Sequence, residues 1–143
     1  MSKDKLIRIW ISTAVLSFVL EGGFSRLMQG AMGRNQLLPW HTLGARGLWL
    51  MAIVAIIGGL AFAAMFLQGY RGLGAKEGVR FGFWVTLLAG IPSTLAFAAM
   101  LPMGRRLPAE FIGADFVTFL VCGIVAAAIA GSGAAQKAGA AGA

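Results

Sequence analysis

Two carboxylates lie inside apolar stretches of this chain, where an acidic side chain is costly unless a proton or a partner neutralises it. Glu21 belongs to the first stretch and Asp115 to the last. Polar residues accompany Glu21 at a regular spacing of four, namely Thr13, Ser17, Ser25 and Gln29. Asp115 is followed at i+3 and i+7 by Thr118 and Cys122. Residues at these spacings share one face of a helix, so each stretch predicts a polar seam.

The chemistry that such seams favour is the handling of protons or cations. Glu21 and Asp115 would act as the titrating groups, with Ser17 and Thr118 as polar neighbours in one cluster. The run Pro92-Ser93-Thr94, near the middle of the third apolar stretch, could meet the same cluster. A purely structural alternative remains open for each carboxylate. Glu21 could pair with an arginine near the membrane surface, the choices being Arg26, Arg34 and Arg46. Asp115 could lie near a helix start, where a carboxylate interacts favourably with the helix dipole.

The elements that must position these residues are four apolar runs, near residues 6–24, 48–67, 81–101 and 111–130. Each is close to the ~20 residues that a helix needs to cross a bilayer. The chain is 59 % apolar and only 12 % charged, so it has too few polar residues to cover the surface of a soluble globular protein. We therefore predict an all-α fold, an integral membrane four-helix bundle. One domain would cover residues 1–131, and a low-complexity tail, 132–143, would be mobile in an isolated chain.

Charge predicts the surroundings and the topology. The net charge of +7 comes from basic residues spread along loops, which indicates anionic lipids as partners and no nucleic acid. An even number of spans puts both termini on one side, with seven basic residues there against five on the other. The positive-inside rule then places the termini in the cytoplasm. We expect a retained first helix, not a cleaved signal peptide, in a bacterial inner membrane.

Small residues recur every four positions and predict close contact between helices. One seam leads into the third helix and another lies in the fourth, comprising Gly74, Gly78, Gly82 and Gly90, and Gly123 and Ala127. Small residues at this spacing let helix backbones approach in a membrane. Such seams can pack within the bundle or against another subunit, and we expect at least one to face outward.

Enzymatic sites are not indicated. Cys122 is the only cysteine and His41 the only histidine, so neither a multi-cysteine metal site nor a nucleophilic triad can be assembled from this chain. We predict no cofactor and no metal. His41, beside Trp40 in the first loop, is a candidate ligand for a haem or pigment, and the alternative is an interfacial polar residue.

Two resemblances follow from particular residues. The run Gly78-Val-Arg80-Phe-Gly82 after a glycine-rich loop, with Pro92 in the same helix, resembles small four-helix bacterial inner-membrane proteins of unknown function. Glu21 followed by Leu27-Met28 resembles the first helix of the small multidrug resistance transporters. That resemblance implies that Glu21 is a shared proton- and substrate-binding carboxylate and that the fourth helix forms a dimer face. The chain departs from that family in its long first loop and in having only Trp84 where the family has a tyrosine-rich signature.

Two functions fit these features. The first is a non-enzymatic accessory subunit of a larger membrane complex, docked through the small-residue seams. The second is a proton-coupled transporter of small lipophilic cations, acting as a homodimer and using Glu21.

Overall fold

The computed structural model describes residues 3–31, 40–100 and 106–140, and the side chains in those ranges except 25–31, 40–45, 47, 97, 100, 106, 107 and 133–140. Every element in the described ranges is helical. The helices are α1 (Lys3–Ala31), α2 (Trp40–Gly69), α3 (Ala75–Val85), α4 (Ile91–Met100) and α5 (Arg106–Ala140), with a π-helical turn, η1 (Thr86–Gly90), joining α3 to α4. The predicted all-α class is confirmed.

Four segments of the described chain are long and apolar enough to cross a membrane. They are Lys3–Phe24, Leu48–Gly69, Ala75–Ala96 and Pro108–Ser132. The third runs through α3, η1 and most of α4. Large apolar side chains are exposed along these spans, including Val19, Val54 and Leu88. Exposed apolar side chains are stable in the hydrocarbon core of a bilayer but not in water. The chain is therefore a multi-pass membrane protein whose spans form a four-helix bundle.

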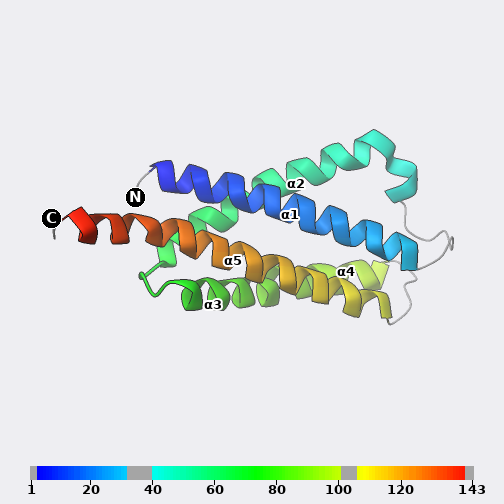
Figure 1. The fold of residues 1–143 in the computed structure, drawn as a ribbon. Helices are drawn as coiled ribbons and strands as arrows, with labels where there is room; N and C mark the ends of the chain where they lie inside the picture. Colours follow the sequence, from blue (N-terminus) through cyan, green and yellow to red (C-terminus); the bar gives the residue numbers. More distant parts are fainter. Residues whose placement is uncertain (1–2, 32–39, 101–105, 141–143) are drawn as a thin grey trace.

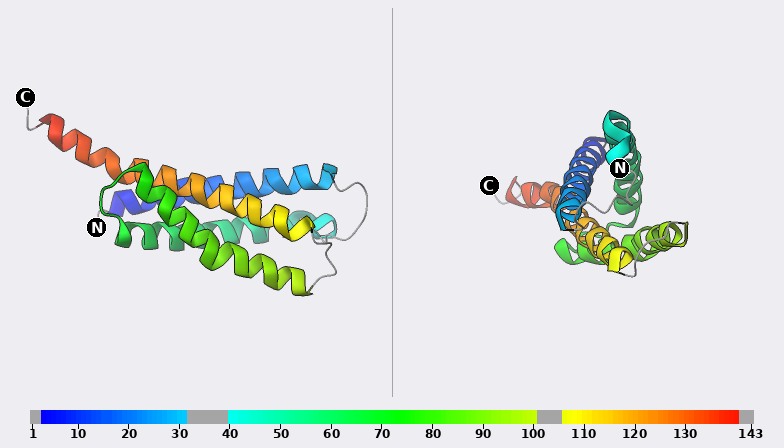
Figure 2. Two further views of the ribbon diagram at one scale, coloured as in Figure 1. Left: turned by 90° about the horizontal axis from the view of Figure 1, so that it is seen from below. Right: turned by 90° about the vertical axis from the view of Figure 1, so that its right-hand side faces the viewer.

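Helix α5 occupies the middle of the bundle. It packs against α1 on one side and α3 on the other, while α2 packs mainly against α1 (Figures 1 and 2). Both termini lie at the same end of the bundle (Figure 1), and we call this the terminal end and the opposite one the loop end. At the loop end, α2 lies beside α1 and α4 lies beside α5, and α2 and α4 are apart from one another (Figure 2).

The core lies toward the terminal end. Phe62 and Phe66 of α2 both meet the ring of Phe81 edge-on, with centroid distances of 5.0 and 5.2 Å. Phe62 also stacks on Phe119 of α5 at 6.3 Å. Around these rings, buried residues from α1, α2 and α5 complete the cluster, namely Ile9, Ala63, Cys122, Ala126, Ala127 and Ala130. Edge-to-face aromatic contacts add to the burial of apolar area.

The helix–helix contacts around α5 depend on glycine. A Cβ atom on Gly78 would overlap the carbonyl oxygen of Gly123, and one on Gly82 would overlap that of Phe119. Both positions have room for hydrogen only, so α3 and α5 touch backbone to backbone. Ala127 is buried beside Gly78 in the same contact. On the other side of the bundle, Gly59 of α2 approaches α1 closely as well, against the backbone of Ala14.

These contacts correct the expectation of an outward-facing seam. The small residues of α2, α3 and α5 at Gly59, Gly78, Gly82 and Gly123 are occupied by contacts within the chain. Gly74 is not part of a seam. It precedes α3 with a φ of 69°, a left-handed conformation that glycine adopts without strain.

Several helix ends differ from those expected. Helix α1 continues to Ala31 and α2 begins at Trp40, so the first loop is much shorter than the apolar runs suggested. Helix α5 continues to Ala140, so most of the predicted tail is helical. Hydropathy marks only the part of a helix in the membrane, and an alanine-rich sequence has high helix propensity beyond it. Pro108 lies in the first turn of α5, where a missing N–H costs little.

Candidate functional site

The polar seam of α1 divides between two neighbouring helices. The hydroxyl of Thr13 donates to the carbonyl oxygens of Ile9, at 2.8 Å, and of Gly59 on α2, at 3.3 Å. Ser17 instead faces α5, with its Oγ 3.7 Å from the sulfur of Cys122. Glu21, one turn further along, lies close enough to Asp115 for their charges to interact. The side of the seam that carries the carboxylate therefore lies between α1 and α5.

On α5, the three predicted polar residues follow the same interface. Asp115 lies at the level of Glu21, Thr118 is buried with 3 % of its surface exposed, and Cys122 is buried beside Ser17. The thiol of Cys122 also lies 3.9 Å from the carbonyl oxygen of Thr13, within reach of a weak hydrogen bond. The structure thus brings Glu21, Ser17 and Asp115 to the contact between α1 and α5, and Thr118 is buried about one turn from Asp115 on α5.

The π-helical turn supplies a further polar group. Pro92 has no N–H to donate to the carbonyl of Leu88, and its ring would clash with that carbonyl in a regular α-helix. The chain instead forms a wider turn, in which the N–H of Ile91 donates to the carbonyl oxygen of Thr86. Helix α4 then begins in a register that lets the Thr94 hydroxyl donate to Asp115 Oδ2 at 3.3 Å. Turns of this kind are frequent at functional sites.

Gly90, the last residue of the π turn, leaves space for the Asp115 side chain. A Cβ at this position would lie 3.2 Å from both Cβ and Oδ2 of Asp115. Such a contact is tighter than ordinary packing, so the glycine allows the carboxylate to rest against the turn. Gly90 therefore contributes to the acidic site, in addition to being one of the predicted packing residues.

Two aromatic rings close the site toward the loop end. Phe24 follows Glu21 by three residues, and Phe111 precedes Asp115 by four, so each ring lies about one turn beyond its carboxylate on antiparallel helices. The rings meet edge-on with centroids 6.2 Å apart. We call the group formed by Glu21, Asp115, Thr94, Ser17, Phe24 and Phe111 the acidic pair site.

Neither carboxylate of this site forms an ion pair with a basic side chain in the part of the chain that the structure describes. Arg46, one of the three arginines considered as a partner for Glu21, is exposed. Arg26 and Arg34 lie outside the described side chains. Asp115 is nine residues beyond the first residue of α5, Arg106, and so is well past the first turn where the helix dipole acts.

Comparison of the chain with protein-family models, with curated proteins and with solved structures finds no match. The assignment of a role therefore depends on the geometry alone.

Other candidate groups do not join the site. Among the described residues, no three or more His, Cys, Asp or Glu side chains gather in a way that could hold a metal ion. His41 lies in the first turn of α2, but its side chain is outside the described residues. Sequence reasoning placed Thr94 near the carboxylates but missed Phe24 and Phe111 as members of the site. The spacing of each phenylalanine from a carboxylate puts its ring about one turn away, but it does not show that the two rings meet.

Proposed function

We propose that this protein is a proton-coupled transporter of small lipophilic cations and that Glu21 and Asp115 form its binding site. The observation that supports this proposal is that two carboxylates, on α1 and α5, lie within the membrane-spanning bundle close enough for their charges to interact. Two negative charges in surroundings of low dielectric repel one another strongly. A proton on either carboxylate, or a cation bound near both, lowers that cost, so the pair is suited to exchange one for the other.

The rest of the acidic pair site supports a lipophilic substrate. The rings of Phe24 and Phe111 lie one turn from the carboxylates and offer π faces and apolar area to an organic cation. Thr94 and Ser17 provide hydroxyl groups beside Asp115 and along α1. In this mechanism the carboxylates bind one monovalent cation when both are ionised and release it when one proton binds, so the net charge of the pair is the same with the cation as with the proton.

The test is a flux assay in vesicles with the purified protein. An outward gradient of a lipophilic dye cation should drive proton movement that a pH-sensitive dye inside the vesicle reports. Glu21→Gln and Asp115→Asn should each reduce this flux to the level of protein-free vesicles, because an amide cannot exchange a proton. Asp4→Asn is the matched control, since Asp4 is exposed in the first turn of α1. Normal flux in folded Glu21→Gln protein would refute the proposal.

A second candidate is the accessory subunit of a larger membrane complex, favoured by the course of α5. This helix continues beyond its apolar run, which ends near residue 130, to Ala140 and extends away from the other helices (Figure 2). A partner could pack on this extension, although the small-residue seams are occupied within the chain. Mild extraction followed by native mass spectrometry separates the two functions. A large assembly of fixed stoichiometry supports the subunit, and a free monomer or homodimer supports the transporter.

For either function we propose a bacterial inner membrane with cytoplasmic termini. The support is the excess of basic residues at the terminal end, seven against five, together with the placement of both termini at that end (Figure 1).

A further inference from the structure

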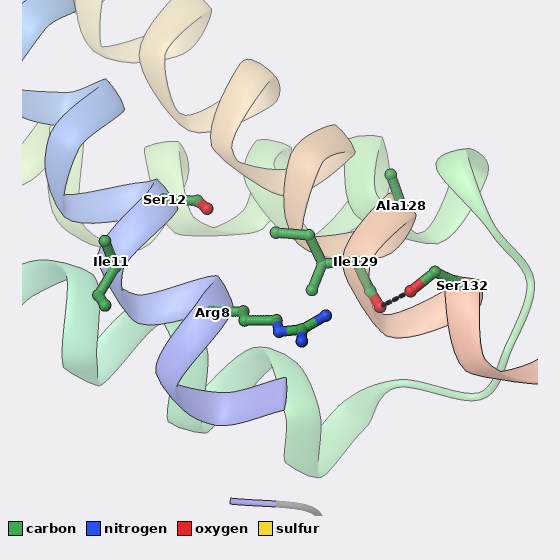
Figure 3. A pocket seen from close by; sticks show the side chains of 6 residues that line it. All are labelled: Arg8, Ile11, Ser12, Ala128, Ile129 and Ser132. Carbon is green, nitrogen blue, oxygen red and sulfur yellow. Dashed lines mark hydrogen bonds between the residues drawn. The ribbon is translucent and has the colours of Figure 1, made fainter. Parts of the chain in front are cut away.

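An open groove lies between α1 and α5 near the terminal end, away from the acidic pair site. It encloses about 500 Å³ and is lined by Arg8, Ile11, Ser12, Ala128, Ile129 and Ser132 (Figure 3). Arg8 lies near the start of the first apolar run, at residue 6, and Ser132 lies just beyond the last one, which ends near residue 130, so this end of the groove lies near the membrane boundary. Ile11, Ala128 and Ile129 lie about one helical turn deeper.

Arg8 is the only charged side chain among the residues that line the groove. Its guanidinium group extends across the gap toward α5 (Figure 3), and it forms no hydrogen bond or ion pair with the side chains that the structure describes. Lys5, one turn earlier, is already occupied, because its Nζ donates to the carbonyl oxygen of Ala130 at 2.6 Å. Ser132 donates to the carbonyl oxygen of Ile129 at 2.8 Å, which leaves lone pairs but no donor for a ligand.

The charge around the groove selects the kind of ligand. Of the described residues at the terminal end, six are basic, namely Lys3, Lys5, Arg8, Arg71, Lys76 and Arg80, and two are acidic. One of the two, Glu77, already accepts the N–H groups of Arg71 and Leu73, at 2.7 and 3.0 Å. The basic residues would repel the positive group of a zwitterionic headgroup such as phosphatidylcholine, whereas they would attract an anionic headgroup.

We propose that this groove binds an anionic phospholipid. The phosphate would lie on the Arg8 guanidinium, whose planar fork matches a phosphate group. One acyl chain would follow the apolar wall formed by Ile11, Ala128 and Ile129 into the membrane. The polar groups at the boundary and the apolar wall below them follow the order of groups in a glycerophospholipid. This site does not depend on the transport proposal, because it shares no residue with the acidic pair site.

The test compares lipids by thermal stability. Short-chain phosphatidylglycerol or phosphatidylcholine is added at equal concentration to the full chain in detergent. A ligand that binds only the folded state raises Tm, so phosphatidylglycerol should raise it by about 3 °C more than phosphatidylcholine does. Arg8→Gln should abolish that difference. Arg80→Gln is the matched control, since Arg80 is the sixth residue of α3 as Arg8 is of α1, and both are exposed.

A second variant tests the apolar wall separately. Ala128→Leu keeps Arg8 and fills part of the groove, so it should also abolish the preference for phosphatidylglycerol. Retention of the preference in Arg8→Gln would overturn the proposal. Equal losses in Arg8→Gln and Arg80→Gln would overturn it as well, because they would show attraction by the whole basic end instead of binding in the groove. Cation flux through the acidic pair site should be unchanged in Arg8→Gln and in Ala128→Leu, so a failure of the lipid proposal can be told apart from a failure of the transport proposal.

Discussion

At the scale of single residues, the pair formed by Glu21 and Asp115 lowers the stability of the fold. Glu21 and Asp115 approach one another between α1 and α5, and a single hydroxyl, that of Thr94, donates to Asp115 from α4. Bringing like charges together in a membrane opposes folding. Sites that keep such groups commonly trade stability for function. The stability of a neutral variant is therefore informative about the role of the pair.

We predict that Glu21→Gln leaves Tm unchanged or raises it, with a gain in the free energy of unfolding of up to about 2 kcal/mol. The change removes repulsion with Asp115 and keeps the shape of the side chain. If Glu21 instead formed a buried ion pair, the same change would lower stability by about 3–5 kcal/mol, because a charge would lose its partner. Thermal unfolding in detergent measures the difference. Asp4→Asn is the control, and a large drop confined to Glu21→Gln would contradict the prediction.

The meeting of Glu21 with Asp115 could be predicted from spacing, because helical periodicity assigns each to a polar face. The place of Thr94 in the same cluster could be expected from its position near the middle of the third apolar run, but its hydrogen bond to Asp115 and the contact of the two phenylalanines could not. Thr94 reaches Asp115 only because the π turn changes the register of α4, and a regular helix would have placed it on another face. Phe24 and Phe111 meet only when α1 and α5 pack in antiparallel register, which is a tertiary property.

At the scale of the elements, the π turn links the sequence to the site. Pro92 accounts for η1, since it removes one helical hydrogen bond and its ring crowds the preceding turn. The turn contains one residue more than a regular α-helical turn would, which rotates the face of α4 by about 100°. Helix α4 carries Thr94, so the position of this hydroxyl relative to α5 depends on one proline.

We predict that Pro92→Ala converts η1 to α-helix and moves Thr94 away from Asp115. The measurement uses Thr94→Cys with Asp115→Cys in a Cys122→Ser background, joined by a short dithiol-reactive cross-linker. Cross-linking should fall several-fold when Pro92→Ala is added. Pro108→Ala is the control, because that proline lies in the first turn of α5 and shapes no inner turn. Equal cross-linking with and without Pro92 would show that the turn has another cause.

The existence and the number of the spans were accessible from hydropathy, but the helix ends were not. The apolar runs end where the hydrocarbon ends, whereas the helices continue wherever the backbone can hydrogen-bond. Helix α5 illustrates this, since its apolar run ends near residue 130 and the helix continues to Ala140 through alanine-rich sequence. The spacing of Gly78 and Gly82 predicted a contact surface between helices, but spacing alone does not say which helix packs on it. In the structure that helix is α5.

At the scale of the whole molecule, the bundle separates two kinds of surface. The terminal end contains the groove lined by Arg8 and the aromatic core. The loop end contains the acidic pair site, and α2 and α4 lie apart there (Figure 2). Lipid binding at one end and cation exchange at the other would then occur at opposite sides of the membrane. Which side each occupies depends on how the whole chain is oriented, and that depends on a difference of two basic residues.

We predict that this orientation is easily changed. Arg71→Gln with Arg80→Gln lowers the count of basic residues at the terminal end from seven to five, equal to the five on the loop side. Because positively charged loops are retained in the cytoplasm, the variant should insert in both orientations. Reporters fused after Ala143, a fluorescent protein active inside and alkaline phosphatase active outside, measure the proportion of each. The control, Arg105→Gln with Arg106→Gln, lowers the loop-side count from five to three and should keep one orientation. If both pairs of changes left the termini wholly cytoplasmic, features other than loop charge would determine the topology.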